Sequence, residues 1–374
     1  PIDTSSNECT ITLPASASVG DTLVFSDYAR NWATNKIIID SNGLNYQSRA
    51  DTWTVEYSTD GLSLAITYMD ATQGWIPTTD DDVTDAPIKG NQEGIFGFGY
   101  DGSLTAVTNL VSNAGVVATD TTGVGTARKE LAACEYGGDK GIFGFGVDGS
   151  SKVSTTNLVS NAGVVSSDVT GVGTGRDGPA ACSYGGDKGI FGFGYISTSP
   201  NYVSMTNLVS NTGVVATDTT GVGTARMALK ACEYGGDKGI FAYGSPTTAV
   251  SNLVSNTGVV ATDTTGVGTA RQYPGACSYG YDKGIFGYGD TGSVTAITNL
   301  VSNAGVVASD VTGVGTARKE LAATQYGGDK GIFGYGDTGS RTAITNLVSN
   351  AGVVATDTTG VGTAREYPAA CSFN

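Results

Sequence analysis

Short apolar stretches separated by glycine-rich turns recur from about residue 94 to the C-terminus. In one copy, AACEY at 132–136 is followed by the turn GGDK and then by GIFGFG; TNLVSN and a segment beginning GVV come later. Runs of four to eight residues that are rich in β-branched and aromatic side chains and bounded by turn residues predict strands. The pattern therefore predicts an all-β protein with four short antiparallel strands in each repeat.

Six copies of this unit follow one another. An arginine marks each unit, with spacings of 48, 50, 45, 47 and 47 residues. Four strands at such a period indicate the blades of a β-propeller, whereas a solenoid would need atypical capping repeats at both ends. The first unit begins at Gly94 without a first strand, and a spare one, AACSFN, ends the chain. We therefore expect six blades over 94–374, closed by Ala369–Asn374 pairing beside Gly94–Gly99.

The repeat resembles the kelch repeat. Small residues before an aromatic (AAC-Y), a glycine-rich apolar strand (IFGFG), and an arginine before the next unit carry this resemblance over residues 94–374. The unit departs from kelch repeats in lacking the Gly-Gly doublet after the second strand and the late tryptophan. The resemblance implies a propeller fold and does not indicate a particular function.

Each unit also contains an aspartate and an arginine eight positions apart. A residue type repeated in every unit favours a structural contact, within a blade or between neighbours, over a ring of ligand-binding charges. The pairs are Asp120 and Arg128, Asp168 and Arg176, Asp218 and Arg226, Asp263 and Arg271, Asp310 and Arg318, and Asp357 and Arg365.

Five of the six cysteines occupy one repeat position, and Thr324 holds the same position in the remaining unit. Equivalent positions around a ring lie too far apart for a disulfide. We expect free packing thiols, as is usual for assembly in a reducing cytoplasm.

Residues 1–78 do not match the repeat. Alternating segments such as CTITLPASASVGDTLVFSD predict a small β-domain, and TTDDDVTDAP at 78–87 marks the start of an acidic linker at 79–93. The stretches ITLPASASVGDTLVFSDYARNWATNKIIIDSNG and ATQGWIPT resemble a module of virion fibre proteins in tailed bacteriophages, especially those of marine and cyanobacterial hosts. The resemblance implies a place on the virion, contacts with other virion proteins through this domain, and a homotrimeric fibre. The chain begins at Pro1 without a methionine, which indicates a fragment or a processed product.

The loops of the six units vary unequally. The GGDK and Asn-x-Gly turns are expected on one face and hardly change among the copies. The loop after the second strand and the link to the next unit are expected on the other face, and both differ among the copies. Unselected sequence variation in exposed loops would affect both faces equally. Tyrosine, which occurs in the variable segments, is frequent in binding surfaces. The first domain should join the constant face, which leaves the variable face to present ligand-binding residues: Tyr100, Asp101, Lys129, Glu130, Tyr195, Tyr202, Tyr273, Arg341 and Tyr367.

Composition narrows the function. The net charge of −15 disfavours binding to nucleic acid, and no apolar run is long enough to insert into a membrane. The absence of histidine removes the commonest general base and transition-metal ligand, and the YDGS and VDGS turns are too short for a calcium loop. No cofactor or metal site is expected.

The resemblance of the first domain implies a phage virion fibre protein, assembled in the host cytoplasm. With the variable face, it leads us to expect a propeller that binds a host-surface glycan or envelope protein. One alternative is an architectural decoration protein of the capsid or tail. A second is a fibre-borne polysaccharide depolymerase that uses carboxylates near the variable face. No motif with catalytic spacing is present, so we expect a binding protein rather than an enzyme. The acidic candidates for the depolymerase are Asp101, Glu130, Asp148, Asp177 and Glu366.

Overall fold

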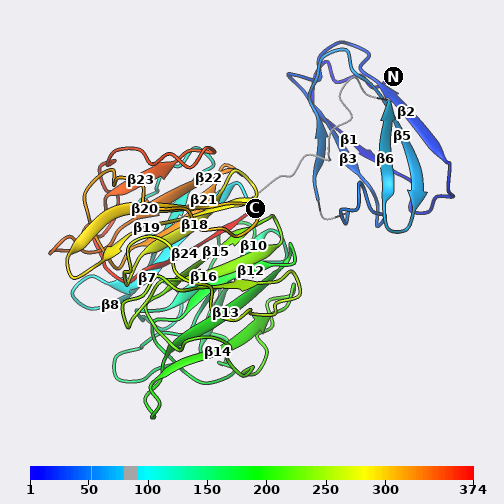
Figure 1. Ribbon diagram of the computed structural model, residues 1–374. Helices are drawn as coiled ribbons and strands as arrows, with labels where there is room; N and C mark the ends of the chain where they lie inside the picture. Colours follow the sequence, from blue (N-terminus) through cyan, green and yellow to red (C-terminus); the bar gives the residue numbers. More distant parts are fainter. Residues whose placement is uncertain (52, 80–90) are drawn as a thin grey trace. The chain divides into compact units, whose positions relative to one another are not determined.

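The computed structural model describes residues 1–51, 53–79 and 91–374 (Figure 1). The chain forms two compact units, Pro1–Lys89 and Gly90–Asn374. In the described residues every regular element is a β-strand, which confirms the predicted all-β class, and none of them forms a helix suited to crossing a membrane. The predicted linker 79–93 lies mostly outside the described residues; its ends, Thr79 and Glu93, belong to strands.

The first unit contains two three-stranded sheets. One has the order β1-β3-β4, with β1 and β3 parallel, and the other has the order β2-β5-β6. Their buried faces meet around Trp32, Tyr46 and Trp75. The strands are β1 (Cys9–Thr12), β2 (Thr22–Ser26), β3 (Ile37–Asp40), β4 (Val55–Tyr57), β5 (Ser63–Asp70) and β6 (Gly74–Thr79).

The second unit contains six three-stranded antiparallel sheets, one for each repeat. The first strands are β9 (Ala132–Tyr136), β12 (Ala180–Tyr184), β15 (Lys230–Tyr234), β18 (Gly275–Tyr279), β21 (Ala322–Tyr326) and β24 (Ala369–Phe373). The middle strands are β7 (Glu93–Tyr100), β10 (Lys140–Gly144), β13 (Lys188–Tyr195), β16 (Lys238–Ala242), β19 (Lys283–Asp290) and β22 (Lys330–Gly334). The third strands are β8 (Leu104–Val111), β11 (Thr156–Val159), β14 (Tyr202–Val209), β17 (Ser251–Val254), β20 (Val294–Val301) and β23 (Thr345–Val348).

The C-terminal strand β24 completes the sheet of the first repeat. It pairs antiparallel with β7, from Ala369 opposite Gly97 to Phe373 opposite Glu93, and the two lie close together in Figure 1. The Gln92 amide donates to the Asn374 carbonyl oxygen at 2.9 Å, at the position where other repeats have the GGDK turn. The first strands also contact one another in the series β9, β12, β15, β18, β21, β24, and β24 contacts β9.

The prediction of a fourth strand in each repeat is wrong. The segment after the third strand pairs with it only at isolated bridges, such as Val111 with Val117 and Thr108 with Thr121. Between these bridges the chain leaves the ladder, because the third-strand asparagine Asn109 donates its amide to the Ala118 carbonyl oxygen and to the Asp120 carboxylate. Side-chain bonds thus replace part of the backbone pairing.

Neighbouring sheets pack through sulfur and glycine. All six cysteines are free, and the five repeat-position cysteines are buried. A Cβ added at Gly141 would lie 2.4 Å from the Cys371 sulfur, and one at Gly189 would lie 2.6 Å from the Cys134 sulfur. In five repeats the glycine before the IF pair therefore leaves room for a thiol from the adjoining sheet, and in the first repeat Gly94 leaves room for Thr324.

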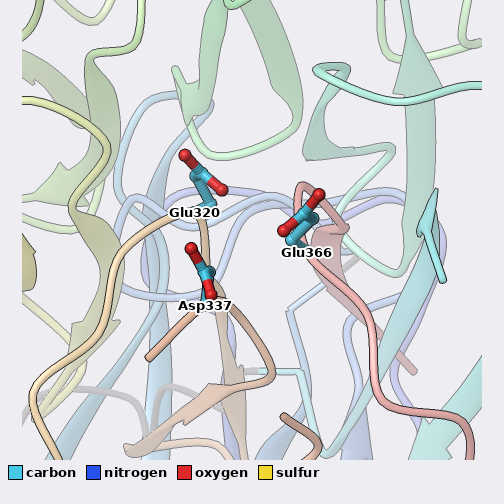
Figure 2. Close-up of side chains that lie close together, drawn as sticks. All are labelled: Glu320, Asp337 and Glu366. Carbon is cyan, nitrogen blue, oxygen red and sulfur yellow. The ribbon is translucent and has the colours of Figure 1, made fainter. Parts of the chain in front are cut away.

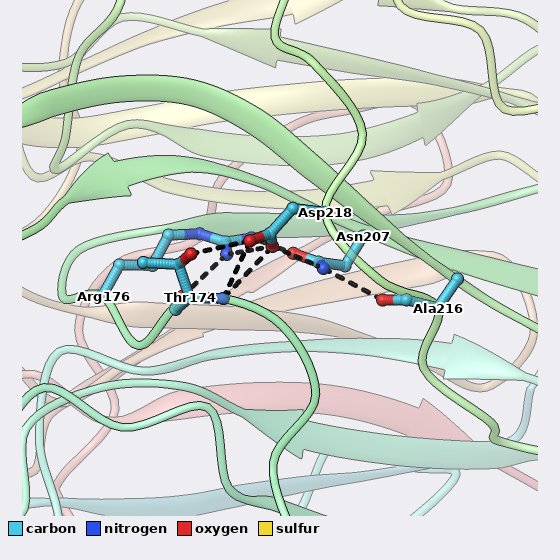
Figure 3. Close-up of polar contacts among 5 residues, drawn as sticks. All are labelled: Thr174, Arg176, Asn207, Ala216 and Asp218. Carbon is cyan, nitrogen blue, oxygen red and sulfur yellow. Dashed lines mark hydrogen bonds and ion pairs between the residues drawn. The ribbon is translucent and has the colours of Figure 1, made fainter.

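The repeated aspartates and arginines connect adjacent repeats. Asp218 accepts hydrogen bonds from the backbone and hydroxyl of Thr174 in the preceding repeat, and its carboxylate lies 3.8 Å from Arg176 (Figure 3). Arg176 is fully buried, donates to Asn207 at 2.7 Å and stacks 4.0 Å from the centroid of the Phe145 ring. These contacts are structural ones between neighbours, one of the two arrangements left open by the sequence: the aspartate of a repeat meets the arginine of the repeat before it.

Candidate functional site

The link between repeats and the loop after the middle strand lie on the same side of the second unit. Lys129 forms a bridge with Val147, and Tyr100 forms one with Glu366; equivalent bridges occur in the other repeats. On the opposite side the GGDK turns meet one another, since the Gly137 amide donates to the Asp187 carbonyl oxygen at 2.7 Å. We call the side with the links and middle-strand loops the link face.

The central residue of each three-residue link adopts a left-handed backbone conformation. Amides and carbonyls of successive central residues are hydrogen-bonded; for example, the Tyr367 amide donates to the Glu320 carbonyl oxygen at 2.8 Å. Together these residues surround an opening that we call the mouth. Its residues, with φ between 53° and 58°, are Glu130, Gly178, Ala228, Tyr273, Glu320 and Tyr367.

Side chains at the mouth occupy strained positions. A non-glycine residue with positive φ is uncommon and costs on the order of 1 kcal/mol, while glycine adopts this conformation readily. Gly178 shows that the link accepts glycine, yet glutamate or tyrosine occupies four of the six equivalent positions. Strain of this kind gathers at binding and catalytic sites, which favours a role for these four side chains.

A small pocket opens at the mouth. Its volume is about 20 Å³, and its walls include Leu131, Pro179, Leu229, Leu321 and Pro368 beside the mouth residues. Apolar walls with a few converging polar groups are typical of ligand sites. Lys230, the first residue of β15, also lines this pocket.

Burial shifts the pKa values of the ionisable groups that line the pocket. It raises the pKa of the Glu130 carboxyl, with further elevation from Asp177, although Lys129 opposes it. Burial also raises the pKa of Glu320, against a lowering hydrogen bond from Tyr367. Burial lowers the pKa of the Lys230 amine to about 8, with Glu130 acting in the opposite direction. The pocket thus combines carboxylates and an amine that titrate closer to neutrality than exposed ones.

Aromatic and cationic groups surround the mouth. The rings of Tyr273 and Tyr367 meet edge to face, with centroids 5.8 Å apart. The Lys129 ammonium lies 5.1 Å from the Tyr367 ring and 5.3 Å from the Tyr100 ring, and the Arg341 guanidinium lies 4.6 Å from Tyr100. The structure therefore brings together six of the nine predicted ligand-binding residues: Tyr100, Lys129, Glu130, Tyr273, Arg341 and Tyr367.

The other three predicted residues lie at the middle-strand loops of the link face. Tyr195 and Tyr202 pack edge to face 5.3 Å apart at the ends of β13 and β14, and the Lys152 ammonium lies 3.8 Å from the Tyr195 ring. Asp101 accepts hydrogen bonds from the backbone amide and hydroxyl of Ser103, at 3.0 and 3.1 Å. Its carboxylate is therefore occupied in a turn.

Three carboxylates gather beside the mouth. Glu320, Asp337 and Glu366 each place an oxygen within 4.8 Å of the others (Figure 2). Basic side chains already face two of them, since Lys319 lies 3.5 Å from Glu320 and Arg341 lies 3.7 Å from Glu366. Three oxygens of this kind could ligate a divalent cation, but the neighbouring cations compensate the same charges.

Sequence reasoning missed Lys230 and Glu320 as site residues. Lys230 stands where other repeats have alanine or glycine. This departure from the repeat was the observation that could have identified Lys230 as a site residue. Glu320 has the same link, KEL, as Glu130, and the equivalence of the two links was the signal available. Nothing in the sequence indicated that Asp337 and Glu366 meet, because one follows β22 and the other lies in the last link.

A search against protein-family models finds no match, and a search of curated proteins likewise finds none. The function proposed for this chain therefore rests on its residues, on its geometry and on the resemblances described for its sequence.

Proposed function

We propose that the six sheets of the second unit are the blades of a β-propeller that the C-terminal strand closes. The pairing of β24 with β7 and the contact of β24 with β9 support this architecture. In a propeller the first strands surround the axis, so the mouth would be the axial opening on the link face.

We further propose that the link face binds a ligand on the surface of a host cell, a glycan or an envelope protein. The observation that carries this proposal is the mouth itself, where Glu130, Tyr273, Glu320 and Tyr367 are held in a strained conformation around a pocket. As the broader part of this proposal, the chain is a tailed-phage virion fibre protein whose first unit contacts other virion proteins. That part rests on the resemblance of the first unit to fibre modules.

The test is binding of the full chain to intact bacteria from a panel of candidate hosts. A variant with Tyr273→Ala and Tyr367→Ala removes both rings. Alanine is the residue that the chain has at the equivalent link position, Ala228. Lys188→Ala, beside a turn on the opposite side, is the matched control. Saturable binding that the double variant loses and the control keeps would support the proposal. Equal binding by all three proteins would contradict it, and absence of binding to every host would favour an architectural role on the virion.

One observation favours a second candidate function, hydrolysis of a polysaccharide. Glu320 has a raised pKa and lies close to Asp337 and Glu366 (Figure 2), and an acid beside a second carboxylate is the arrangement of glycoside hydrolases. Release of new reducing ends from host polysaccharide, lowered about 100-fold or more by Glu320→Gln, would establish this activity. Undiminished release by the variant would exclude Glu320 as its acid.

A further inference from the structure

The first residues of the first strands line the central opening, which continues inward from the mouth, and Lys230 is one of them. Lys230 has a long side chain where the equivalent residues of the other repeats are small. The other five first strands begin with alanine or glycine at the equivalent position, namely Ala132, Ala180, Gly275, Ala322 and Ala369. A single lysine among near-identical repeats is not needed for the fold that five copies form without it.

The side chain of Lys230 stands between two cavities. It lines the mouth pocket and also a deeper cavity of about 30 Å³ whose other walls are alanines. Within the described residues no carboxylate lies at ion-pair distance from its ammonium, and no hydrogen bond engages it. An ammonium group at the floor of a pocket without a bonded partner has donors free for a ligand.

The other basic side chains of the link face are engaged. Lys129 lies 3.8 Å from Glu130, Lys152 lies 3.0 Å from Asp177, and Lys319 lies 3.5 Å from Glu320. Arg341 contacts Glu366. A ligand that enters the mouth therefore meets Lys230 as its available donor cation and Glu130 and Glu320 as acceptors.

We propose that the mouth takes the uncharged hydroxymethyl arm of a hexose, with Lys230 donating to its hydroxyl oxygen and a mouth carboxylate accepting a hydrogen bond from its proton. A hydroxyl group both accepts and donates, so it complements an amine and a carboxylate at once. A carboxylate arm would meet Glu130 and Glu320 as like charges beside the opposite charge of Lys230, and an ammonium arm would meet Lys230 as a like charge beside the two carboxylates. The uncharged arm meets no like charge and can bond to both kinds of group.

The size of the pocket fits this arm. A volume of about 20 Å³ holds roughly one water molecule, so one hydroxyl group can replace that water while the sugar ring stays outside. Tyr273 and Tyr367 line the pocket where the apolar face of such a ring would rest. The inference rests on the proposed glycan-binding function and names the part of the glycan that the mouth binds.

The experiment compares three methyl hexosides that differ only at carbon 6: the hydroxymethyl form, the uronate and the 6-amino-6-deoxy form, each in the glucose, galactose and mannose series. Each is titrated into the full chain while the Lys230 side-chain NMR signal is followed, this signal being assigned by its loss in Lys230→Ala. Calorimetry measures the affinities of the wild type, of Lys230→Ala and of the control Lys188→Ala. Alanine at 230 is the residue that four equivalent positions already have.

We expect the hydroxymethyl form of at least one series to shift the Lys230 signal saturably and to bind at least about tenfold more tightly than either charged form. Lys230→Ala should weaken that binding about tenfold or more, and the control should not. Tighter binding of a charged form, unchanged affinity in Lys230→Ala, or no shift with any hexoside would overturn the inference. If cells are still bound through Tyr273 and Tyr367 in that case, the proposed function stands and only the assignment of the arm fails.

Discussion

Asp120, in the first repeat, accepts a hydrogen bond of 3.0 Å from the backbone amide of Thr363, in the last, although 243 positions separate them. The Thr363 hydroxyl donates to the same carboxylate. Arg365 lies two positions beyond Thr363, and its Nε donates to the Phe98 carbonyl oxygen at 2.9 Å. The contacts that join consecutive repeats elsewhere thus also join the last repeat to the first.

The first prediction tests closure of the proposed ring. Asp120→Ala removes the contact between the last and first repeats, and Asp218→Ala removes its counterpart between two consecutive repeats. Each should lower the free energy of unfolding by about 1–3 kcal/mol, because hydrogen bonds to a charged group are lost. Urea denaturation of both variants makes the comparison. A loss near zero for Asp120→Ala beside a clear loss for Asp218→Ala would contradict closure.

The first three strands of each repeat could be predicted from the sequence, because each is a short run rich in β-branched and aromatic residues that turn residues bound. The loss of the fourth strand could not. That outcome depends on Asn109 and Asp120, whose side chains bond to each other and to neighbouring backbone in place of a ladder. These residues recur in every repeat, but their recurrence alone does not tell which backbone groups their side chains bond.

The candidate site was predictable only in part. Variation among the links indicated Glu130, Tyr273 and Tyr367, and the structure places all three at the mouth. Their left-handed conformation was not predictable, because glutamate and tyrosine rarely adopt it. The role of Lys230 depends on the neighbouring sheets that enclose it, which no local pattern describes.

The second prediction concerns sulfur and glycine packing between the last strand and β10. Gly141→Ala should destabilise the protein by about 1–3 kcal/mol, because the new methyl group would lie 2.4 Å from the Cys371 sulfur while its next neighbours are 3.4 Å away. Cys371→Ala removes that sulfur. In a double-mutant cycle measured by thermal unfolding, the double variant should therefore be more stable than the sum of the single effects predicts, by about 1 kcal/mol. Strict additivity would show that the two residues do not oppose each other.

The third prediction separates backbone strain from side-chain function at the mouth. Glu130→Gly and Glu130→Ala both remove the carboxylate, but only glycine relieves the strain of a φ of 53°. The glycine variant should be more stable than the alanine variant by about 1 kcal/mol. The reverse substitution, Gly178→Ala, should cost a similar amount, since Gly178 has a φ of 57°. Equal stability of the two Glu130 variants, measured by urea denaturation, would mean that the link relaxes without strain.

The fourth prediction concerns a carboxyl group at the other end of the central opening. Burial, helped by the nearby Glu135, raises the pKa of Glu233 to about 8. Ser183, which donates a hydrogen bond of 2.8 Å to Glu233, acts in the opposite direction. The folded state therefore holds the Glu233 proton more tightly than the unfolded state, whose glutamate titrates near 4.5. Between these two values the unfolded state has fewer bound protons, so stability falls as the pH rises.

Glu233→Ser removes this titration and inserts the residue found at the equivalent positions 183, 278 and 372. Below about pH 4 both proteins should show similar pH dependence, because Glu233 is protonated in the folded and unfolded states. Above about pH 8 the serine variant should gain stability relative to the wild type by roughly 2–5 kcal/mol, the upper end being the full conversion of the pKa difference. Chemical denaturation from pH 4 to pH 9 measures the difference. A constant difference across this range would show that Glu233 titrates at its ordinary pKa in the folded protein, because its carboxylate would then be solvated at the end of the opening.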